Sequence, residues 1–185
     1  MRLPRILRAI LFYLIQWTWG LPQNLVGLAV LLLLGKQERY HMHGALVTIF
    51  EKNRLLNQRG AVSLGRYIFI PDSWDEDYAR RTAVHEYGHT VQSMILGPFY
   101  LLAVGLPSVI WARVWSGSRQ KARLAAKTAA LSASGGLQAE AEKAKQVRLS
   151  PRAERIAAAR YTSRYPENWA NLLGEYVTGE TPPKD

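Results

Sequence analysis

The stretch Thr82-Ala83-Val84-His85-Glu86-Tyr87-Gly88-His89-Thr90-Val91-Gln92 decides how the rest of the chain is interpreted. Histidines four residues apart lie on the same face of a helix, so His85 and His89 can reach one metal ion. Glu86 is offset from that face and is placed to take a proton from a metal-bound water without being a ligand. Glu86 is also the only charged residue in the stretch, as expected of a helix buried under a metal site. The alternative is a helix with two histidines and no metal.

The residues around this motif predict the limits of its helix. Ser73 is placed to cap the helix, and Glu76 follows three residues later. The helix should run to about Leu96, where a Gly-Pro pair follows. Gly88 lowers helix stability, so we expect another backbone or a substrate to approach it closely.

Composition restricts both the partners and the metal ligands. The chain has 185 residues, enough for one domain with one hydrophobic core, and its net charge is +10. This charge favours an anionic partner, either a membrane surface or nucleic acid. Two long apolar stretches flanked by basic residues favour membrane lipid, and we find no nucleic-acid-binding module. The absence of cysteine excludes disulfides and thiolate ligands, so a metal site must use histidine and carboxylate groups.

Residues 1–35 are predicted to form a membrane-associated apolar segment ahead of a domain that covers residues 36–185. The apolar part is too long for a usual signal peptide and lacks a clear cleavage site. From Ala9 to Leu34 a straight helix would be about 39 Å long, enough to cross a bilayer with tilt. The polar, Gly and Pro residues in its middle could instead mark a bend between two half-helices. Nearby tryptophans, Trp17 and Trp19, suit a membrane interface.

Residues 39–71 are predicted to be β structure. One strand is expected over residues 40–50 and another over residues 61–70, with Pro71 at its end and a polar turn over residues 51–60 between them. The fold class is therefore α+β, with a small antiparallel sheet ahead of the motif helix. An edge strand of such a sheet can hold an extended peptide.

The second half of the chain contains a further apolar stretch and a basic region. Residues 97–115 are short for an independent span and are expected to form a buried, re-entrant or interfacial segment. Residues 116–160 are expected to be a basic helical insertion, and a last helix should cover residues 166–177. Basic residues lie on all sides of both apolar stretches, which fits a protein that enters the membrane without crossing it. We therefore expect the inner (cytoplasmic) membrane, with the site on the cytoplasmic side.

A catalytic zinc site needs three protein ligands and an open position. No His-x-x-Gly-x-x-His pattern follows the motif, so the three-histidine version is excluded. A downstream carboxylate is then expected, and Glu167 is the first choice because it opens a helix after Pro166. The alternative for Glu167 is an ordinary acidic residue at a helix N-terminus. Glu175 is the second choice.

Other titratable residues are weaker candidates. Glu140 and Glu142 fall in the basic insertion. His41 and His43 alternate along the predicted strand and could line the site, although a strand surface is the simpler location.

Several segments together resemble a known group of proteins. The segments are residues 85–93, 96–101 and 105–108, and the match extends to residues 63–66 and 167–171. They resemble small bacterial membrane-associated proteins that carry a His-Glu-Tyr-Gly-His motif of the metallopeptidase type. More broadly the chain is similar to gluzincin-type zinc peptidases, which implies a zincin-like core. The resemblance covers most of the chain except the basic insertion.

The resemblance implies a role for each residue of the motif. His85 and His89 would be metal ligands, Glu86 the catalytic base and Glu167 the third ligand. The expected activity is that of a membrane-associated zinc-dependent metallopeptidase, a hydrolase whose substrate is a peptide or protein. In this mechanism zinc activates a water that Glu86 deprotonates, and the resulting hydroxide attacks the peptide carbonyl.

The sequence leaves the oxyanion donor and some rival functions open. Candidate donors are Tyr161, Tyr165 and His41. An amidase acting on a non-peptide bond would use the same residues. The rivals from other classes are a non-catalytic membrane scaffold or partner-binding protein with a structural metal, and a basic membrane-surface protein without metal.

Overall fold

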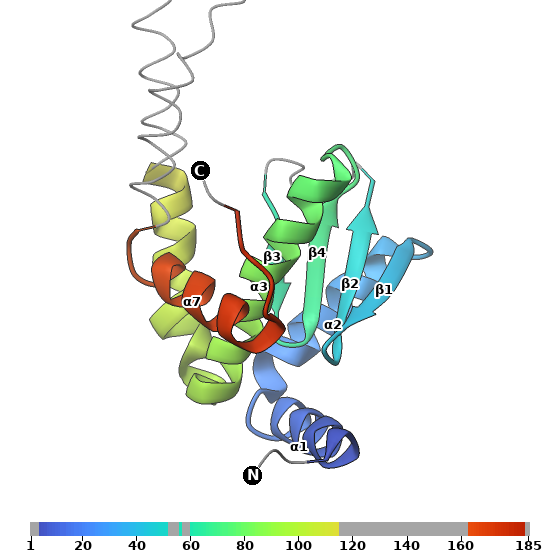
Figure 1. The fold of residues 1–185 in the computed structure, drawn as a ribbon, viewed down its shortest axis with the longest axis vertical. Coiled ribbons are helices and arrows are strands. Elements are labelled where there is room, and N and C mark those ends of the chain that lie inside the picture. The colour runs from blue at the N-terminus through green and yellow to red at the C-terminus, as the bar shows by residue number, and fades with distance from the viewer. Residues whose placement is uncertain (1–3, 52–55, 57–59, 115–162, 184–185) are drawn as a thin grey trace, which may run out of the picture.

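The computed structural model describes residues 4–51, 56, 60–114 and 163–183 (Figure 1). Its helices are α1 (Arg5–Trp17), α2 (Leu21–Leu34), α3 (Glu76–Leu96) and α7 (Glu167–Thr178). A 3₁₀ turn (Gly97–Phe99) and a π-helical turn (Leu101–Gly105) follow α3 and lead into an apolar helix that ends at Val114. The strands are β1 (Glu38–Met42), β2 (Ala45–Phe50), β3 (Val62–Leu64) and β4 (Tyr67–Pro71). The predicted insertion at residues 116–160 lies outside the described residues.

The four strands form one mixed sheet in the order β1-β2-β4-β3. β1 pairs antiparallel with β2, and β3 pairs antiparallel with β4. β2 and β4 run parallel, with Leu46 opposite Tyr67. The predicted α+β class is confirmed, but the prediction of an antiparallel sheet is wrong. The sheet is mixed because two hairpins are joined through their second strands, and β3 lies outside β4.

Each of the two predicted strands is a hairpin rather than one strand. His43 and Gly44 have φ angles of 48° and 92°, and Gly65 has φ 63°. Left-handed residues of this kind reverse the chain in tight hairpin turns. The turn at residues 43–44 separates β1 from β2, and the turn at Gly65 separates β3 from β4.

Helices cover both faces of the sheet, so every residue of β4 is buried (Figure 1). On one face a core cluster joins the strands to α3, and its buried members are Ala45, Val47, Ile68, Ile70, Ala83 and Tyr87. On the other face a cluster joins the strands to α2, and its buried members are Leu31, Phe50, Tyr67 and Phe69. The α2 helix is therefore part of the hydrophobic core as well as of the predicted apolar segment.

The N-terminal apolar segment is bent. In the described part of the chain no single helix has both the length and the apolar character needed to cross a bilayer, and α1 and α2 meet that test only as a pair bent by 90°. The bend is held by the buried Asn24 side chain, which donates to the carbonyl oxygens of Gln16 (2.6 Å) and Gly20 (2.8 Å). Its Oδ1 accepts from the Arg66 backbone N–H at 2.9 Å. The structure thus has the bend that the Gly and Pro residues allowed.

The motif helix α3 ends where predicted, and its start differs by the capping residue. The cap is Asp75, whose carboxylate accepts from the Tyr78 backbone N–H at 2.9 Å, so the prediction of Ser73 is wrong. Asp75 has the extended conformation that a capping residue needs, directly before the first helical residue. At the other end Gly97 terminates the helix with φ 54°. The last predicted helix is confirmed as α7.

Candidate metal centre

Two glycines allow α7 to cross α3 at close range (Figure 1). A Cβ atom added at Gly88 would overlap the carbonyl oxygen of Ala170 and lie 2.5 Å from its carbonyl carbon. A Cβ atom at Gly174 would in turn lie 3.0 Å from the carbonyl carbon of Val84. The expectation that another backbone approaches Gly88 is confirmed. Because the two backbones touch, a side chain at the start of α7 reaches the histidine face of α3.

The crossing brings together His85, His89 and Glu167. The Oε2 atom of Glu167 lies 3.1 Å from His85 Nε2 and 3.4 Å from His89 Nε2. One ligand atom from each residue lies within 4.8 Å of the others, a spacing that allows one metal ion to bind all three. The site is enclosed, since the side chains of Glu167, His89 and His85 are 1%, 6% and 12% exposed. His85 is the member that faces solvent most.

A side-chain amide contacts the Nδ1 atom of each imidazole, whereas the Nε2 atoms face Glu167. Asn171 Oδ1 lies 2.7 Å from His85 Nδ1, and Gln92 Oε1 lies 2.7 Å from His89 Nδ1. Gln92 Nε2 donates to the carbonyl oxygen of Pro166 at 3.0 Å, which fixes its Oε1 toward His89. An amide oxygen only accepts, so the Nδ1 atom of His89 donates to Gln92 and its Nε2 faces Glu167. Such partners fix the tautomer and ring orientation of metal-binding histidines.

His85 and Glu167 shift each other's pKa. Burial alone would lower the pKa of His85, but the hydrogen bond to Glu167, with the charges of Glu86 and Glu167, raises it to about 9. Burial alone would raise the pKa of Glu167, whereas the hydrogen bonds from His85 and His89 hold it well below its usual range. Without metal the cluster therefore carries a proton on His85 beside an ionised Glu167. A metal ion would replace that proton.

The donor set fits a divalent transition metal. Two imidazole nitrogens and one carboxylate oxygen are a ligand combination that zinc accepts. The Oε1 atom of Glu167 is buried and has no hydrogen-bond partner among the described residues, so this carboxylate is incompletely satisfied by the protein alone. Within the described residues, no fourth His, Cys, Asp or Glu joins the group. A fourth coordination position on the metal would then remain for water or substrate.

Glu86 lies beside the cluster without belonging to it. Its side chain is buried, and its charge acts on both His85 and Tyr100. Tyr100 is buried too, and burial raises the pKa of its hydroxyl above the ordinary value; the nearby Ser63 hydroxyl opposes this shift, and the charges of Glu86 and Glu167 add to it. Tyr100 therefore remains a protonated donor close to two carboxylates. No sequence pattern pointed to Tyr100, because it lies in the apolar stretch after α3.

The other predicted candidates lie elsewhere or outside the described residues. Glu175 is exposed, two turns along α7 from Glu167. His41 is exposed on β1, and the backbone carbonyl of His43 accepts a hydrogen bond from Tyr87 at 3.1 Å. The Tyr165 hydroxyl donates to the Ala103 carbonyl at 2.7 Å, and its ring stacks on Trp169. The remaining candidates, Glu140, Glu142 and Tyr161, are outside the described residues.

Sequence reasoning missed Gln92 and Asn171 as partners of the two histidines, although a signal was present. Gln92 lies three residues after His89 on the same helix face, and Asn171 lies four residues after Glu167. Gln92 contacts His89 and Asn171 contacts His85, so both polar residues are placed to orient a proposed ligand.

No protein-family model, no curated protein and no solved structure matches this chain.

Proposed function

We propose that this protein is a zinc-dependent hydrolase that cleaves peptide bonds. The observation that carries the proposal is the buried group of His85, His89 and Glu167, with Glu86 next to it on α3. Two helical histidines, a glutamate from a later helix and a second glutamate beside the pair form the ligand and base set of gluzincin-type peptidases. No other group of titratable side chains in the described residues offers a comparable metal site.

The donor atoms favour zinc over calcium and magnesium. Calcium and magnesium prefer cages made of oxygen, whereas two of the three donors here are imidazole nitrogens. Zinc binds such mixed sets and keeps an open position in catalytic sites. Two histidines and one carboxylate also bind non-haem iron(II), so the choice of zinc over iron rests on the His-Glu-x-x-His arrangement with Glu86 placed as a base.

Glu86 is the general base of the proposed reaction. Bound zinc supplies Lewis acidity and a water of lowered pKa. Glu86 accepts the proton of the attacking water and later donates it to the leaving amine, so the base returns to its starting state when the peptide bond is broken. Gln92 and Asn171 keep the two imidazoles in place during this sequence. The Tyr100 hydroxyl is our candidate donor to the carbonyl oxygen as negative charge develops on it.

The decisive experiment compares two glutamate variants of α3. The parent protein should co-purify with stoichiometric zinc by elemental analysis and should hydrolyse labelled casein or a mixture of quenched fluorescent peptides. Glu86→Gln should retain zinc and lose hydrolysis by about 10²–10⁴-fold. Glu76→Gln, on the exposed first turn of the same helix, should retain both zinc and activity. A Glu86→Gln variant as active as the parent would show that Glu86 is not the base.

A structural zinc site is the rival explanation, because the group is so deeply buried. The two can be separated by replacing zinc with cobalt and recording the absorption spectrum with and without a small hydroxamate. A catalytic site has an exchangeable position, so the spectrum should change when the hydroxamate binds. A spectrum that does not change, together with no hydrolysis by the parent, would favour a structural metal.

A further inference from the structure

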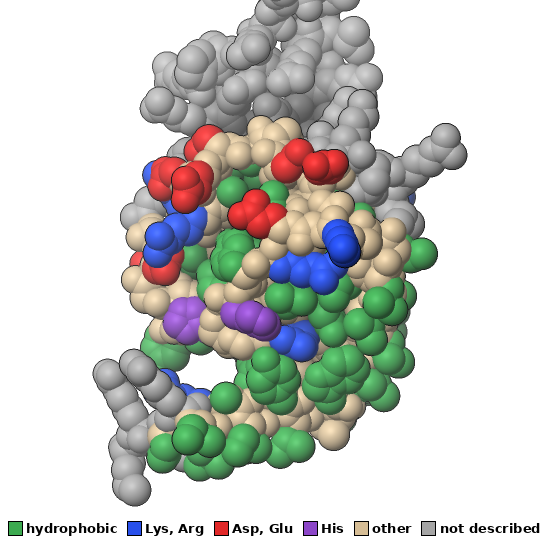
Figure 2. All heavy atoms as spheres, turned by 90° about the vertical axis from the view of Figure 1, so that its right-hand side faces the viewer, with side chains coloured by type: hydrophobic (Ala, Val, Ile, Leu, Met, Phe, Trp, Pro, Cys, Tyr) green, Lys and Arg blue, Asp and Glu red, His purple; other side chains and the backbone are tan. Residues whose placement is uncertain are grey.

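Exposed apolar side chains cover α1 and continue past the bend (Figure 2). On α1 these residues are Ile6, Leu7, Ile10, Leu11, Tyr13, Leu14 and Trp17. Beyond the bend the surface continues with Trp19, Leu21, Leu25 and Val26. A monomeric soluble domain rarely exposes so many large apolar groups together. We call these residues the elbow surface.

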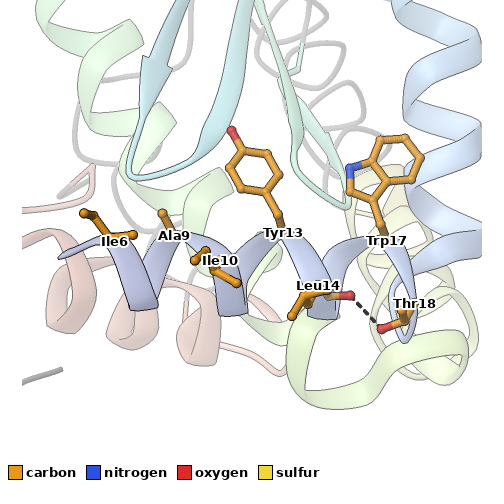
Figure 3. A pocket seen from close by; sticks show the side chains of 7 residues that line it. All are labelled: Ile6, Ala9, Ile10, Tyr13, Leu14, Trp17 and Thr18. Atoms are coloured by element: carbon orange, nitrogen blue, oxygen red, sulfur yellow. Dashed lines mark hydrogen bonds between the residues drawn. The ribbon is translucent and has the colours of Figure 1, made fainter. Parts of the chain in front are cut away.

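The apolar part of α1 is unusually wide. At 100° per residue, its exposed apolar positions span an arc of about 160°, wider than the roughly 100° stripe of an ordinary core-facing helix. Figure 3 shows the side chains that line a hollow along this helix, with Tyr13 and Trp17 on the side of the strands and α2. Phe12 and Gln16, one turn apart, are the residues that α1 buries against the protein.

Polar contacts of Trp19 and Gln23 hold the bend against the rest of the fold. The Trp19 ring packs against Gly97, where a Cβ atom would clash, and its Nε1 lies 3.5 Å from the Ile95 carbonyl oxygen. The buried Gln23 side chain donates to the Gly97 carbonyl oxygen at 3.1 Å. The bend therefore has a fixed orientation relative to α3, whose C-terminal end it contacts. Counted from Gly97 to His89, the metal centre lies about 12 Å along α3 from this contact.

Charge is distributed along the molecule in a way that complements an anionic surface. The chain has no acidic residue in positions 1–37 or 87–139. Arg8 lies one turn from Phe12 on α1, and the Arg66 guanidinium lies 4.8 Å from the centre of the Tyr13 ring. Both cations thus border the apolar arc. Exposed acidic residues lie instead at the start of α3, namely Asp72, Asp75, Glu76 and Asp77.

We propose that the elbow surface binds a lipid bilayer containing anionic lipid, and that α1 lies in the bilayer without crossing it. Helices of 13 and 14 residues are about 20 Å long, short of the roughly 30 Å hydrocarbon core. A fluid bilayer can surround an arc of about 160°, whereas a protein partner or a second copy covers a narrower stripe. The bordering arginines would lie among lipid phosphates, and Trp17 and Trp19 would lie at the interface.

Co-sedimentation of the full chain with preformed vesicles tests this proposal. Binding should be stronger to phosphatidylcholine vesicles that contain phosphatidylglycerol than to phosphatidylcholine alone, and salt should weaken it. The double variant Ile10→Gln with Leu14→Gln should bind on the order of 30-fold more weakly, because two half-exposed apolar side chains no longer enter the bilayer. The matched control, Leu172→Gln with Tyr176→Gln, changes two apolar residues of α7 that are still more exposed and should bind as the parent does.

Two results would overturn the proposal. One is unchanged vesicle binding by the α1 variant. If that variant also converts a dimer to a monomer in sedimentation equilibrium, a second copy is the occupant of the surface.

The other result concerns the topology of the segment in the membrane. Because the chain has no cysteine, Arg8→Cys and Lys36→Cys each provide a single thiol. A membrane-impermeant reagent added outside preformed vesicles should label both, and protection of only one would mean that the segment crosses.

Discussion

Replacing Gly88 with alanine tests whether α3 and α7 meet backbone to backbone. The change should lower the stability of the protein if they do and raise it if they do not. In an ordinary helix interior the change from Gly to Ala stabilises the protein by about 1 kcal/mol. Here the new Cβ atom would lie 2.5 Å from the Ala170 carbonyl carbon, where ordinary contacts begin at 3.4 Å. The helices would have to separate by at least 0.9 Å, from 2.5 to 3.4 Å. Overpacking typically costs about 1–3 kcal/mol, and a clash with backbone atoms is expected at the upper end, about 3 kcal/mol.

The net expectation for Gly88→Ala is a loss of about 2 kcal/mol in the free energy of unfolding, after the helix gain offsets part of the clash. In a chain of 185 residues this corresponds to a melting temperature about 4–8 °C lower. Metal binding should suffer as well. A shift of 0.9 Å is several times the roughly 0.2 Å tolerance of metal-ligand distances, so Glu167 would no longer complete the site.

Thermal unfolding and zinc titration by calorimetry measure the two effects separately. The matched control is Gly105→Ala, whose Cβ atom would meet its nearest neighbour at 3.7 Å, an ordinary contact. This control should bind zinc as the parent does and should be unchanged or slightly more stable. If Gly88→Ala raised the melting temperature and retained zinc, the close crossing of α3 and α7 would be refuted, along with our account of how Glu167 reaches the histidines.

Three further predictions address the orientation of the ligands, the protons in the site and the helix cap. Asn171→Leu removes the partner of His85 Nδ1 and should lower zinc affinity by about 10–100-fold in calorimetric titrations while the circular dichroism spectrum stays native; unchanged affinity would exclude a positioning role. Because the pKa of His85 is raised to about 9 without metal, the protonated form stabilises the metal-free protein fully below the unfolded value near 6.5, and this contribution is lost as pH rises toward 9. Over the same window zinc affinity should rise with pH and about one proton should be released per zinc, measured by calorimetry in buffers of different ionisation enthalpy; release of none would contradict the proton-sharing cluster. Asp75→Ala should lower the free energy of unfolding by about 1 kcal/mol in urea titrations and leave zinc binding unchanged, whereas Ser73→Ala, the residue first expected to cap, should have little effect.

Local features of the sequence predicted the motif helix well. The periodic placement of His85 and His89, the Gly-Pro pair after Leu96 and the cost of Gly88 in a helix all act within a few residues, so they can be recognised from the chain alone. The approach of a second backbone to Gly88 followed from that cost. Which backbone it was could not follow, since Ala170 is far away in the sequence and only packing selects it.

The errors in predicting the sheet arose where one or two left-handed residues turn the chain. His43 and Gly44 lie inside a stretch whose apolar residues suit one long strand, and two left-handed conformations turn it into a hairpin. A non-glycine residue with positive φ is uncommon, so the pattern gave little reason to place a turn there. The parallel pairing of β2 with β4 depends on how two hairpins dock, which hydrophobic alternation does not specify. The bend was signalled locally, by the Gly and Pro residues and by polar residues such as Asn24, which holds it.

The great sequence distance between the proposed ligands has a consequence for the protein without its ion. His85 and Glu167 are 82 positions apart, and the chain has no cysteine with which to make a covalent cross-link. An ion bound by both would act as such a cross-link, and closing a loop of this length in the unfolded chain corresponds to about 4 kcal/mol. Chelation should therefore loosen the C-terminal helix before the sheet, and limited proteolysis in EDTA should cut near that helix first.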